Sequence, residues 1–298
     1  MYHEISMKTI LLVVVSFFLL MASPLRAEES RPAASPLGTC SYDFGRLGAD
    51  EASQISALKS IGYAGMAMNL KTEKHLASLK RYQAAIGDDP FRIYAGYYTV
   101  VFDGDLAVQN AHLDNVIDGL KKSDGALWII LRDRKSVATR EQVVAFLRSL
   151  AARTKAAGVA LIIYPHYNDY VATAEEAIPF LKAVDNGNVF ISMHLCHEVR
   201  AGNGDRLDEV AAKIKPWLRL PTINGADIDV VNELDELEGW KRAIQPLTKG
   251  DYDSSKFVDA LKSVGYAGPV ILKTYGLKTA AADHHHTSFK KFQEMTDK

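Results

Sequence analysis

Residues 139–169, TREQVVAFLRSLAARTKAAGVALIIYPHYND, contain one complete repeat of the expected fold. Thr139 and Gln142 have the spacing of a capping box, which favours a helix that begins there. Apolar residues then recur at helical spacing up to Gly158, and glycine suits the left-handed end of a helix. The short apolar run that follows, residues 160–164, is typical of a buried strand. This stretch therefore predicts a helix followed by a strand that ends in polar and aromatic residues.

The same alternation recurs from residue 37 to the C-terminus. Eight strands are expected at residues 38–42, 64–69, 92–98, 126–131, 160–164, 189–194, 218–223 and 270–274. Helices are expected at residues 50–61, 72–86, 106–121, 139–157, 173–184, 205–214, 232–242 and 254–264, and a last helix from residue 287. Eight repeated βα units predict an α/β fold, a (β/α)8 TIM barrel, with a doubly wound open sheet as the alternative.

Residues 1–27 predict a signal peptide for export to the periplasm or the medium. The apolar run that starts at Ile10 has about 13 residues, whereas a membrane-spanning helix needs about 20. A cleavage point is expected after Ala27, and an uncleaved N-terminal anchor is the alternative. Residues 28–36 are rich in Pro, Ala, Ser and charge and predict a flexible leader, so the barrel domain is expected to span residues 37–298. No membrane association is expected after cleavage.

Composition narrows the function further. The 35 basic and 36 acidic residues leave a net charge of -1, so no basic surface for nucleic acid is indicated. The two cysteines, Cys40 and Cys196, are far apart in the chain, and a disulfide framework is not expected. Neither nucleic acid nor an anionic membrane is therefore an expected partner; the small-molecule carbohydrate expected as partner follows from the resemblance described below.

Polar and aromatic residues follow the ends of successive predicted strands. In a TIM barrel, catalytic and binding side chains gather where strands end and the next loops begin. The candidates for substrate binding are Tyr98, Arg132, Tyr164, His166, Asn224 and Asp227, with Tyr42 and Trp240 as further apolar faces for a ring, and those for catalysis are His194, His197 and Lys273. Four neighbouring strands deliver these groups to one face, which predicts a ligand or catalytic site there.

The histidines are the most specific of these candidates. Imidazoles exchange protons near neutral pH, and His166, His194 and His197 together could also bind a transition metal. Residues three apart on a straight strand face opposite sides, so His194 and His197 converge only if the strand ends between them. One packing histidine beside a surface histidine is the alternative. The run at residues 284–286 is expected to be a solvated start of the last helix rather than a metal site.

Residues 244–253, IQPLTKGDYD, and 265–270, GYAGPV, resemble the late segment of the sugar phosphate isomerase/epimerase proteins in the xylose isomerase-like TIM barrel superfamily. The resemblance extends loosely from residue 37 to the C-terminus. It implies an isomerase, epimerase or lyase that acts on a carbohydrate or an oxidised sugar. It also implies a divalent metal held by Glu, Asp, His and Glu at the ends of strands five to eight. Aligned by strand, those positions hold Tyr164, His194, Asn224 and Lys273.

Lys273 is the most informative departure, because an ammonium group repels a divalent cation and can itself supply positive charge. The family's usual metal site is therefore not expected, although a divalent metal remains an open cofactor. One of the three histidines would then be the base, and Lys273 with Arg132 would stabilise an enolate oxygen. A catalytically silent barrel that binds a carbohydrate or a protein is the alternative. Phosphodiester cleavage, as in endonuclease IV relatives, is disfavoured because the many ligands of a three-zinc site and basic loops are missing from the sequence.

Overall fold

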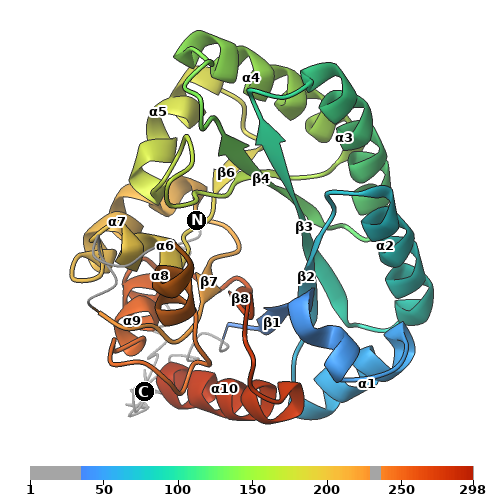
Figure 1. Ribbon diagram of the computed structural model, residues 1–298, viewed down its shortest axis with the longest axis vertical. Coiled ribbons are helices and arrows are strands. Elements are labelled where there is room, and N and C mark those ends of the chain that lie inside the picture. The colour runs from blue at the N-terminus through green and yellow to red at the C-terminus, as the bar shows by residue number, and fades with distance from the viewer. Residues whose placement is uncertain (1–34, 229–235, 298) are drawn as a thin grey trace, which may run out of the picture. The chain divides into compact units, whose positions relative to one another are not determined.

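The computed structural model describes residues 35–228 and 236–297 (Figure 1). The predicted signal peptide, residues 1–27, lies outside the described residues, and so does the predicted leader up to residue 34. The first described strand begins at Leu37, one residue before the expected position.

Eight parallel strands form one sheet in the order β6-β5-β4-β3-β2-β1-β8-β7. The strands are β1 (Leu37–Cys40), β2 (Gly65–Asn69), β3 (Arg92–Val101), β4 (Ala126–Arg132), β5 (Leu161–Ile163), β6 (Val189–Ile191), β7 (Thr222–Ile223) and β8 (Val270–Leu272). Isolated parallel bridges from Ile191 to Leu218 and from His194 to Thr222 join the two end strands. The sheet is therefore curled into the predicted (β/α)8 barrel rather than left open.

Helices lie around the outside of the strands (Figure 1). They are α1 (Glu51–Ile61), α2 (Glu73–Ile86), α3 (Leu106–Lys121), α4 (Arg140–Ala157), α5 (Ala174–Val184), α6 (Leu195–Arg200), α7 (Leu207–Ile214), α8 (Glu236–Ala243), α9 (Ser255–Ser263) and α10 (Ala281–Thr296), with 3-10 helices η1 (Ser41–Arg46) and η2 (Lys215–Trp217). The last helix, α10, packs beside α1, so the ring of helices closes between these two elements. None of the described helices combines the length and the apolar character needed to span a bilayer.

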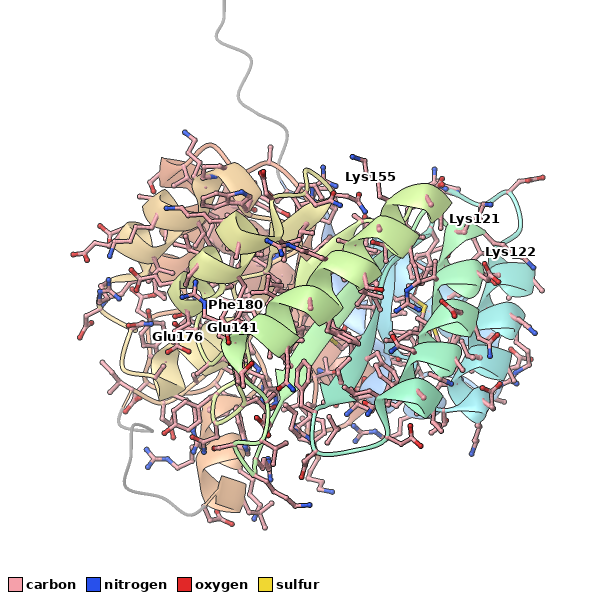
Figure 2. The ribbon with its side chains drawn as sticks, turned by 90° about the horizontal axis from the view of Figure 1, so that it is seen from above. Lys121, Lys122, Glu141, Lys155, Glu176 and Phe180 are labelled. Carbon is pink, nitrogen blue, oxygen red and sulfur yellow. The ribbon has the colours of Figure 1, made fainter. Side chains whose placement is uncertain are left out.

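Helix α4 shows why these segments are helical. The Thr139 hydroxyl accepts the Gln142 N–H at 3.3 Å, and the Gln142 side chain accepts the Thr139 N–H at 2.8 Å, which confirms the predicted capping box. Gly158 ends the helix at a φ of 72°, a left-handed conformation that glycine adopts at little cost. Buried Leu147 faces the sheet, and the charged Lys155 projects outward (Figure 2).

The core has an outer layer between strands and helices and an inner layer inside the barrel. Successive side chains of a strand point to opposite faces, so Tyr98 belongs to the outer layer and Tyr97 to the inner one. Trp128 fills the inner layer and is fully buried. This alternation decides which strand residues reach the end of the barrel.

Two helices differ from the sequence expectation. The segment after β6 forms the short helix α6, which begins at Leu195, because the strand ends at Ile191. Helix α10 begins at Ala281, although the sequence predicts a start at residue 287. Its N-cap, Ala280, has no capping side chain, so the sequence offers no start signal there. The two cysteines are buried free thiols.

Candidate active site at the carboxyl end of the barrel

A cavity of about 440 Å³ opens at the carboxyl ends of the strands, the end at which the polar candidates were expected. Tyr97 of β3, Arg132 of β4 and Lys273, which directly follows β8, contribute to its wall. Aromatic and basic side chains dominate the lining: Tyr42, Tyr97, Trp240 and Tyr275, and Lys71, Arg132, Arg134 and Lys273, together with His166 and His197. Its volume lies within the range of small-molecule sites.

Lys273 lies at the wall of this cavity in a cage of tyrosines. Its ammonium donates to the Tyr164 hydroxyl at 2.8 Å and to the Tyr42 hydroxyl at 3.3 Å. It also lies over three aromatic rings, 5.0 Å from the centroid of Tyr42, 5.2 Å from that of Tyr164 and 5.7 Å from that of Tyr97. Tyr42 donates to the Tyr97 hydroxyl and thereby links the cage together. Aromatic faces and phenol oxygens therefore stabilise a cation here.

The protonation of this cage follows from its neighbours. Burial opposes the charge of Lys273, but the interaction with Tyr164 and the other phenol and thiol groups outweighs it and raises the pKa of Lys273 above its ordinary value. Burial likewise raises the pKa of Tyr164 far above its usual range, although Lys273 opposes that rise. At neutral pH the pair is therefore an ammonium beside a neutral phenol.

His197 is held in the neutral form. It is only 1% exposed, and burial, together with its electrostatic interactions with His166, His194 and Lys273, holds its pKa well below its ordinary value. The Tyr167 N–H donates to its Nδ1 at 3.3 Å, so Nδ1 carries a lone pair and the proton is on Nε2. Among the described residues, that Nε2 has no hydrogen-bond partner. An unpaired buried donor costs about 1–3 kcal/mol, so a ligand oxygen would be stabilising there.

His166 has the opposite arrangement. Its Nδ1 lies 3.1 Å from the Asp169 carboxylate and 3.1 Å from the Tyr167 carbonyl, both of them acceptors, so Nδ1 carries the proton. In the neutral imidazole, Nε2 is therefore the nitrogen with a lone pair. A tight turn brings the two residues together, because the Asp169 N–H donates to the His166 carbonyl at 2.9 Å and Asn168 adopts a left-handed φ of 66°.

The Asp169 side chain is wholly buried and is oriented by Arg132. Arg132 donates to both carboxylate oxygens, each at 2.7 Å. Burial would raise the pKa of Asp169, but the hydrogen bonds from His166 and Arg132 outweigh it and hold the pKa below its ordinary value. Asp169 is therefore an ionised group that fixes the ring of His166, the arrangement by which a buried carboxylate orients a catalytic histidine.

His194 and Tyr164 lie behind the cavity wall rather than in it. Their rings are stacked with centroids 3.5 Å apart, and His194 Nδ1 lies 2.8 Å from the Thr222 hydroxyl. Burial, followed by the charge of Lys273, holds the pKa of His194 well below its ordinary value. Because β6 ends before His194, the two histidines do come near each other, with ring centroids 5.7 Å apart. Even so, only His197 lines the cavity.

Three predicted binding residues lie away from the cavity. Tyr98 packs against His112 of α3 on the outer side of β3. The neighbouring residue Tyr97 lines the cavity, where Tyr98 was expected. The Asn224 amide donates to the carbonyls of Gly225 and Ala243. Asp227 forms an ion pair with Arg242 at 2.7 Å and accepts a hydrogen bond from Gln245 at 2.8 Å. Asn224 and Asp227 thus hold the segment after β7 against the end of α8.

Five aromatic or charged residues of the site were not singled out as candidates from the sequence. They are Lys71, Tyr97, Arg134, Asp169 and Tyr275. Lys71 and Arg134 stand two residues beyond the ends of β2 and β4, a position that could have identified them. Asp169 is three residues from His166, a spacing that becomes informative only once the turn is known.

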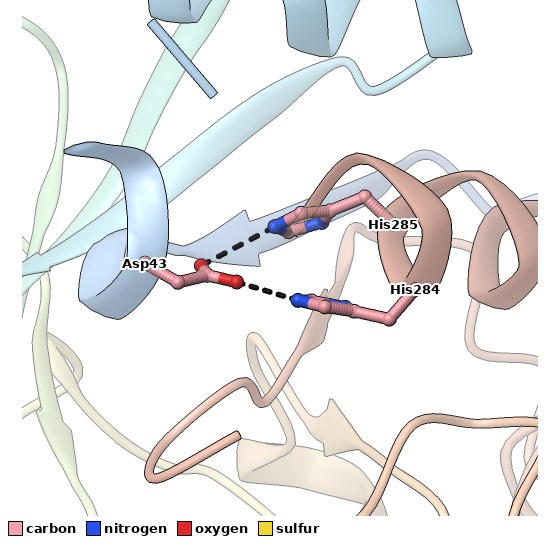
Figure 3. Close-up of side chains that lie close together, drawn as sticks. All are labelled: Asp43, His284 and His285. Atoms are coloured by element: carbon pink, nitrogen blue, oxygen red, sulfur yellow. Dashed lines mark hydrogen bonds and ion pairs between the residues drawn. The ribbon is translucent and has the colours of Figure 1, made fainter. Parts of the chain in front are cut away.

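The expectation that residues 284–286 are solvated is wrong for two of the three histidines. His284 and His285 are buried, and both imidazoles point at the Asp43 carboxylate (Figure 3). Their Nε2 atoms lie 2.5 Å and 3.3 Å from its oxygens. Asp43 of η1 and the two histidines of α10 are buried together. The histidines supply the hydrogen bonds that a buried carboxylate needs.

This cluster is also the group of the described residues that could hold a metal ion. Its three donor atoms all lie within 4.8 Å of one another, and His166, His194 and His197 do not form such a group. The guanidinium of Arg46 lies 3.6 Å from the same carboxylate. Burial opposes ionisation, but the hydrogen bonds from His284 and His285 hold the pKa of Asp43 well below its ordinary range. The cluster therefore binds α10 to the turn after β1 and stands outside the cavity lining.

A closed eight-stranded barrel with a polar cavity at the carboxyl ends of its strands defines a TIM-barrel protein. The chain belongs to the xylose isomerase-like TIM barrel family, whose sequence pattern matches residues 113–291. No curated protein sequence matches the chain significantly.

Solved structures with the same fold include sugar epimerases and a dehydratase. The probable 3-DHS dehydratase AsbF of Bacillus anthracis is 12% identical, with a TM-score of 0.71 over 87% of this chain and 98% of that chain. The 3-keto-D-glucoside 4-epimerase YcjR of E. coli is 15% identical, with a TM-score of 0.66 over 87% and 99%. The D-allulose 3-epimerase of Methylomonas sp., solved with D-allulose, is 15% identical, with a TM-score of 0.69 over 88% and 97%.

The metal site implied by the resemblance does not fit the residues present at the strand ends. Lys273 contributes an ammonium group hydrogen-bonded to Tyr164, and His194 is stacked beneath that ring. The Asn224 amide nitrogen is used by two backbone carbonyls, which leaves its Oδ1 buried without a hydrogen bond among the described residues. A carboxylate is present at none of the four positions.

Proposed function

We propose that the chain is a sugar isomerase, epimerase or lyase that acts by proton transfer at this cavity, without a metal at the strand ends. The substrate is a carbohydrate or an oxidised sugar. The observation that carries the proposal is the opposite protonation of two neighbouring imidazoles. His166 carries its proton on Nδ1, toward Asp169, and His197 carries its proton on Nε2. Their ring centroids are only 4.3 Å apart.

His166 is the general base in this proposal. Asp169 holds its Nδ1–H and leaves the Nε2 lone pair for a proton bound to carbon. His166 lines the cavity, and its side chain is 22% exposed, so a substrate can reach it. Asp169 and Arg132 are positioning residues, because they act through the ring of His166.

His197 and Lys273 stabilise the negative charge that proton removal creates. When the base takes the proton beside a carbonyl, the electron pair moves to the carbonyl oxygen and forms an enolate. The Nε2–H of His197 and the ammonium of Lys273 are donors for that oxygen, and neither loses its own proton at neutral pH. A neutral imidazole that acts as a donor is an established arrangement in other barrels.

The fate of the enolate decides the reaction. Delivery of a proton from solvent to the opposite face of the same carbon, with loss of the abstracted proton from His166 to solvent, gives an epimer. Return of the abstracted proton to the neighbouring carbon, with transfer of the hydroxyl proton, gives an isomer. Departure of a hydroxyl or alkoxide group from the next carbon, taking up a proton, gives a lyase product. The fold is shared with sugar epimerases and with a dehydratase, which supports this set of reactions.

The test is exchange of carbon-bound hydrogen in D₂O, followed by NMR over a panel of aldoses, ketoses and sugar acids. We expect exchange with at least one sugar, reduced about 10²-fold or more in His166→Gln. His286→Gln is the matched control, because His286 is exposed on α10. Full exchange in His166→Gln would refute its role as the base.

The alternative is a catalytically silent barrel that binds a carbohydrate or a protein. The hydrogen bond from His166 Nδ1 to the buried Asp169 carboxylate favours the enzyme, because a site that only binds has no need of an oriented base. Sugar binding without any exchange, unchanged in His166→Gln and His197→Gln, would favour the silent barrel.

Export remains part of the proposal. The predicted signal peptide and cleavage after Ala27 are tested by N-terminal sequencing of the protein from the periplasm or the medium. Recovery only from the membrane fraction, with residues 1–27 still present, would favour the uncleaved anchor.

A further inference from the structure

Positive charge is concentrated around the cavity. Four of its lining residues are basic, namely Lys71, Arg132, Arg134 and Lys273. Within the described ranges, 35–228 and 236–297, the lining includes no aspartate or glutamate. The chain as a whole has a net charge of -1, so this positive charge is local. Asp169, behind the wall, offsets part of it through ion pairs with Arg132 at 2.7 Å and with Arg134 at 3.9 Å.

Lys273 is the most buried basic residue of the lining. It is 7% exposed, and the partners that accept its two hydrogen bonds are neutral phenols. An ammonium group has three donors, so one N–H remains. Among the described residues Lys273 forms no ion pair with a carboxylate, and a buried charge without one is costly.

The electrostatic potential at the rim of the cavity, around Lys71, is also positive. Burial lowers the pKa of Lys71, and the positive charges of Arg132 and Lys273 lower it further, against a smaller opposing effect of Asp169. Lys71 also lies 5.5 Å from the centroid of the Tyr97 ring, a member of the Lys273 cage. Lys71 at the rim and Lys273 at the wall thus contribute to one region of positive potential.

We infer that the substrate is a sugar acid whose carboxylate is bound by Lys273 within this basic cavity. The inference rests on the proposed function and deepens it by naming the substrate class. The tyrosine and tryptophan faces suit a sugar ring, and the volume of about 440 Å³ suits a mono- or disaccharide.

A carboxylate fits this site better than a phosphate does. Phosphate groups favour an arginine fork or several backbone N–H groups. The fork of Arg132 is engaged by both oxygens of Asp169, and Lys273 offers a point charge with one remaining donor. A carboxylate beside the reacting carbon also makes its proton more acidic, because the negative charge that develops spreads onto oxygens next to Lys273.

The test is isothermal titration calorimetry on the purified full chain with glucuronate and galacturonate. Glucose and galactose are the matched neutral sugars, and glucose 6-phosphate is the phosphate probe. We expect a uronate to bind about tenfold or more tightly than its neutral partner, with affinity that falls as salt is added. Equal binding of the neutral sugar, or tighter binding of the phosphate, would overturn the inference.

Substitutions of single lysines test which positive charge binds the uronate carboxylate. Lys273→Met is expected to lose about tenfold or more in uronate affinity, and Lys155→Met, an exposed lysine on α4 (Figure 2), is expected to bind as the unmodified chain does. If Lys273→Met does not fold, Lys71→Met provides a rim variant with a smaller expected loss. Unchanged uronate affinity in a folded Lys273→Met variant would overturn the role of Lys273. Unchanged affinity in Lys71→Met would overturn the contribution of the basic cavity to uronate binding.

The two proposals fail differently. Uronate binding without hydrogen exchange in D₂O would remove the proposed function and leave the anion site intact. Exchange confined to neutral sugars would support the proposed function and overturn the sugar-acid assignment.

Discussion

Glu198 of α6 is a buried carboxyl group whose titration should be visible in the stability of the fold. It accepts the Ala174 N–H at 2.8 Å and the Asn203 amide at 2.6 Å, and it has no ion pair with a basic side chain among the described residues. Burial raises its pKa to about 7, although these two hydrogen bonds oppose the rise. The folded chain therefore binds the Glu198 proton more tightly than the unfolded chain does.

The sign and size of the effect follow from that difference. A rise from 4.5 to about 7, at about 1.4 kcal/mol per pKa unit, corresponds to about 3 kcal/mol in the free energy of unfolding. This contribution is fully present below the unfolded pKa and is lost as the pH rises through about 7. The glutamine of Glu198→Gln does not titrate. As the pH rises from about 4.5 to about 8, the free energy of unfolding of this variant should therefore increase by about 3 kcal/mol relative to that of the unmodified chain.

The assay is urea unfolding followed by circular dichroism at a series of pH values, with the midpoint and the slope recorded for each chain. Glu294→Gln is the control, because Glu294 is an exposed residue of α10. Its pH profile should parallel that of the unmodified chain. Parallel profiles for Glu198→Gln as well would refute the assignment of a raised pKa to Glu198.

Three further outcomes are expected. Asp43→Asn should lower the free energy of unfolding by about 1–3 kcal/mol at neutral pH, and the loss should shrink as acid protonates Asp43 in the unmodified chain, which thermal unfolding at several pH values will show. Gly225→Ala would place a Cβ 2.1 Å from the Pro246 carbonyl oxygen and should lower the melting temperature by several degrees, at a cost of about 1–3 kcal/mol. Gly187→Ala, where a Cβ meets nothing within 4 Å, should leave the melting temperature nearly unchanged. Chelation with EDTA should leave the proposed proton exchange intact, and its complete loss, restored by added zinc or manganese, would contradict chemistry without a metal at the strand ends.

The repeated alternation of strand and helix patterns was sufficient to predict the barrel. Each βα unit repeats the same local pattern, and each strand pairs with the strands of neighbouring units. The alternation was not sufficient to predict which side chain of a strand faces inward. Tyr97 and Tyr98 are adjacent and chemically identical, and only the register of β3 against β2 and β4 decides that Tyr97 reaches the cavity. A one-residue shift exchanges the two faces.

Contacts between distant segments were also beyond the sequence. His284 and His285 have the composition of a solvated helix start, and their burial depends on Asp43, more than 240 positions earlier in the chain. His166 and His197 were both identified, but their opposite protonation depends on Asp169 and on the Tyr167 N–H. Residue type predicted that imidazoles act here, and only the hydrogen bonds assign their roles.

The positive charge of the cavity connects the proposed chemistry to the inferred substrate. Burial and the charge of Lys273 help to keep His197 neutral, which makes its Nε2–H a donor rather than a base. The same charge gives a carboxylate its binding energy. A bound sugar acid would offset part of that field and so raise the pKa of His197, and by linkage the anion would bind more tightly to the protonated form of the site. A lysine at the end of β8 therefore combines two properties in the proposed reaction, because one cation can both attract an anionic substrate and stabilise the enolate formed from it.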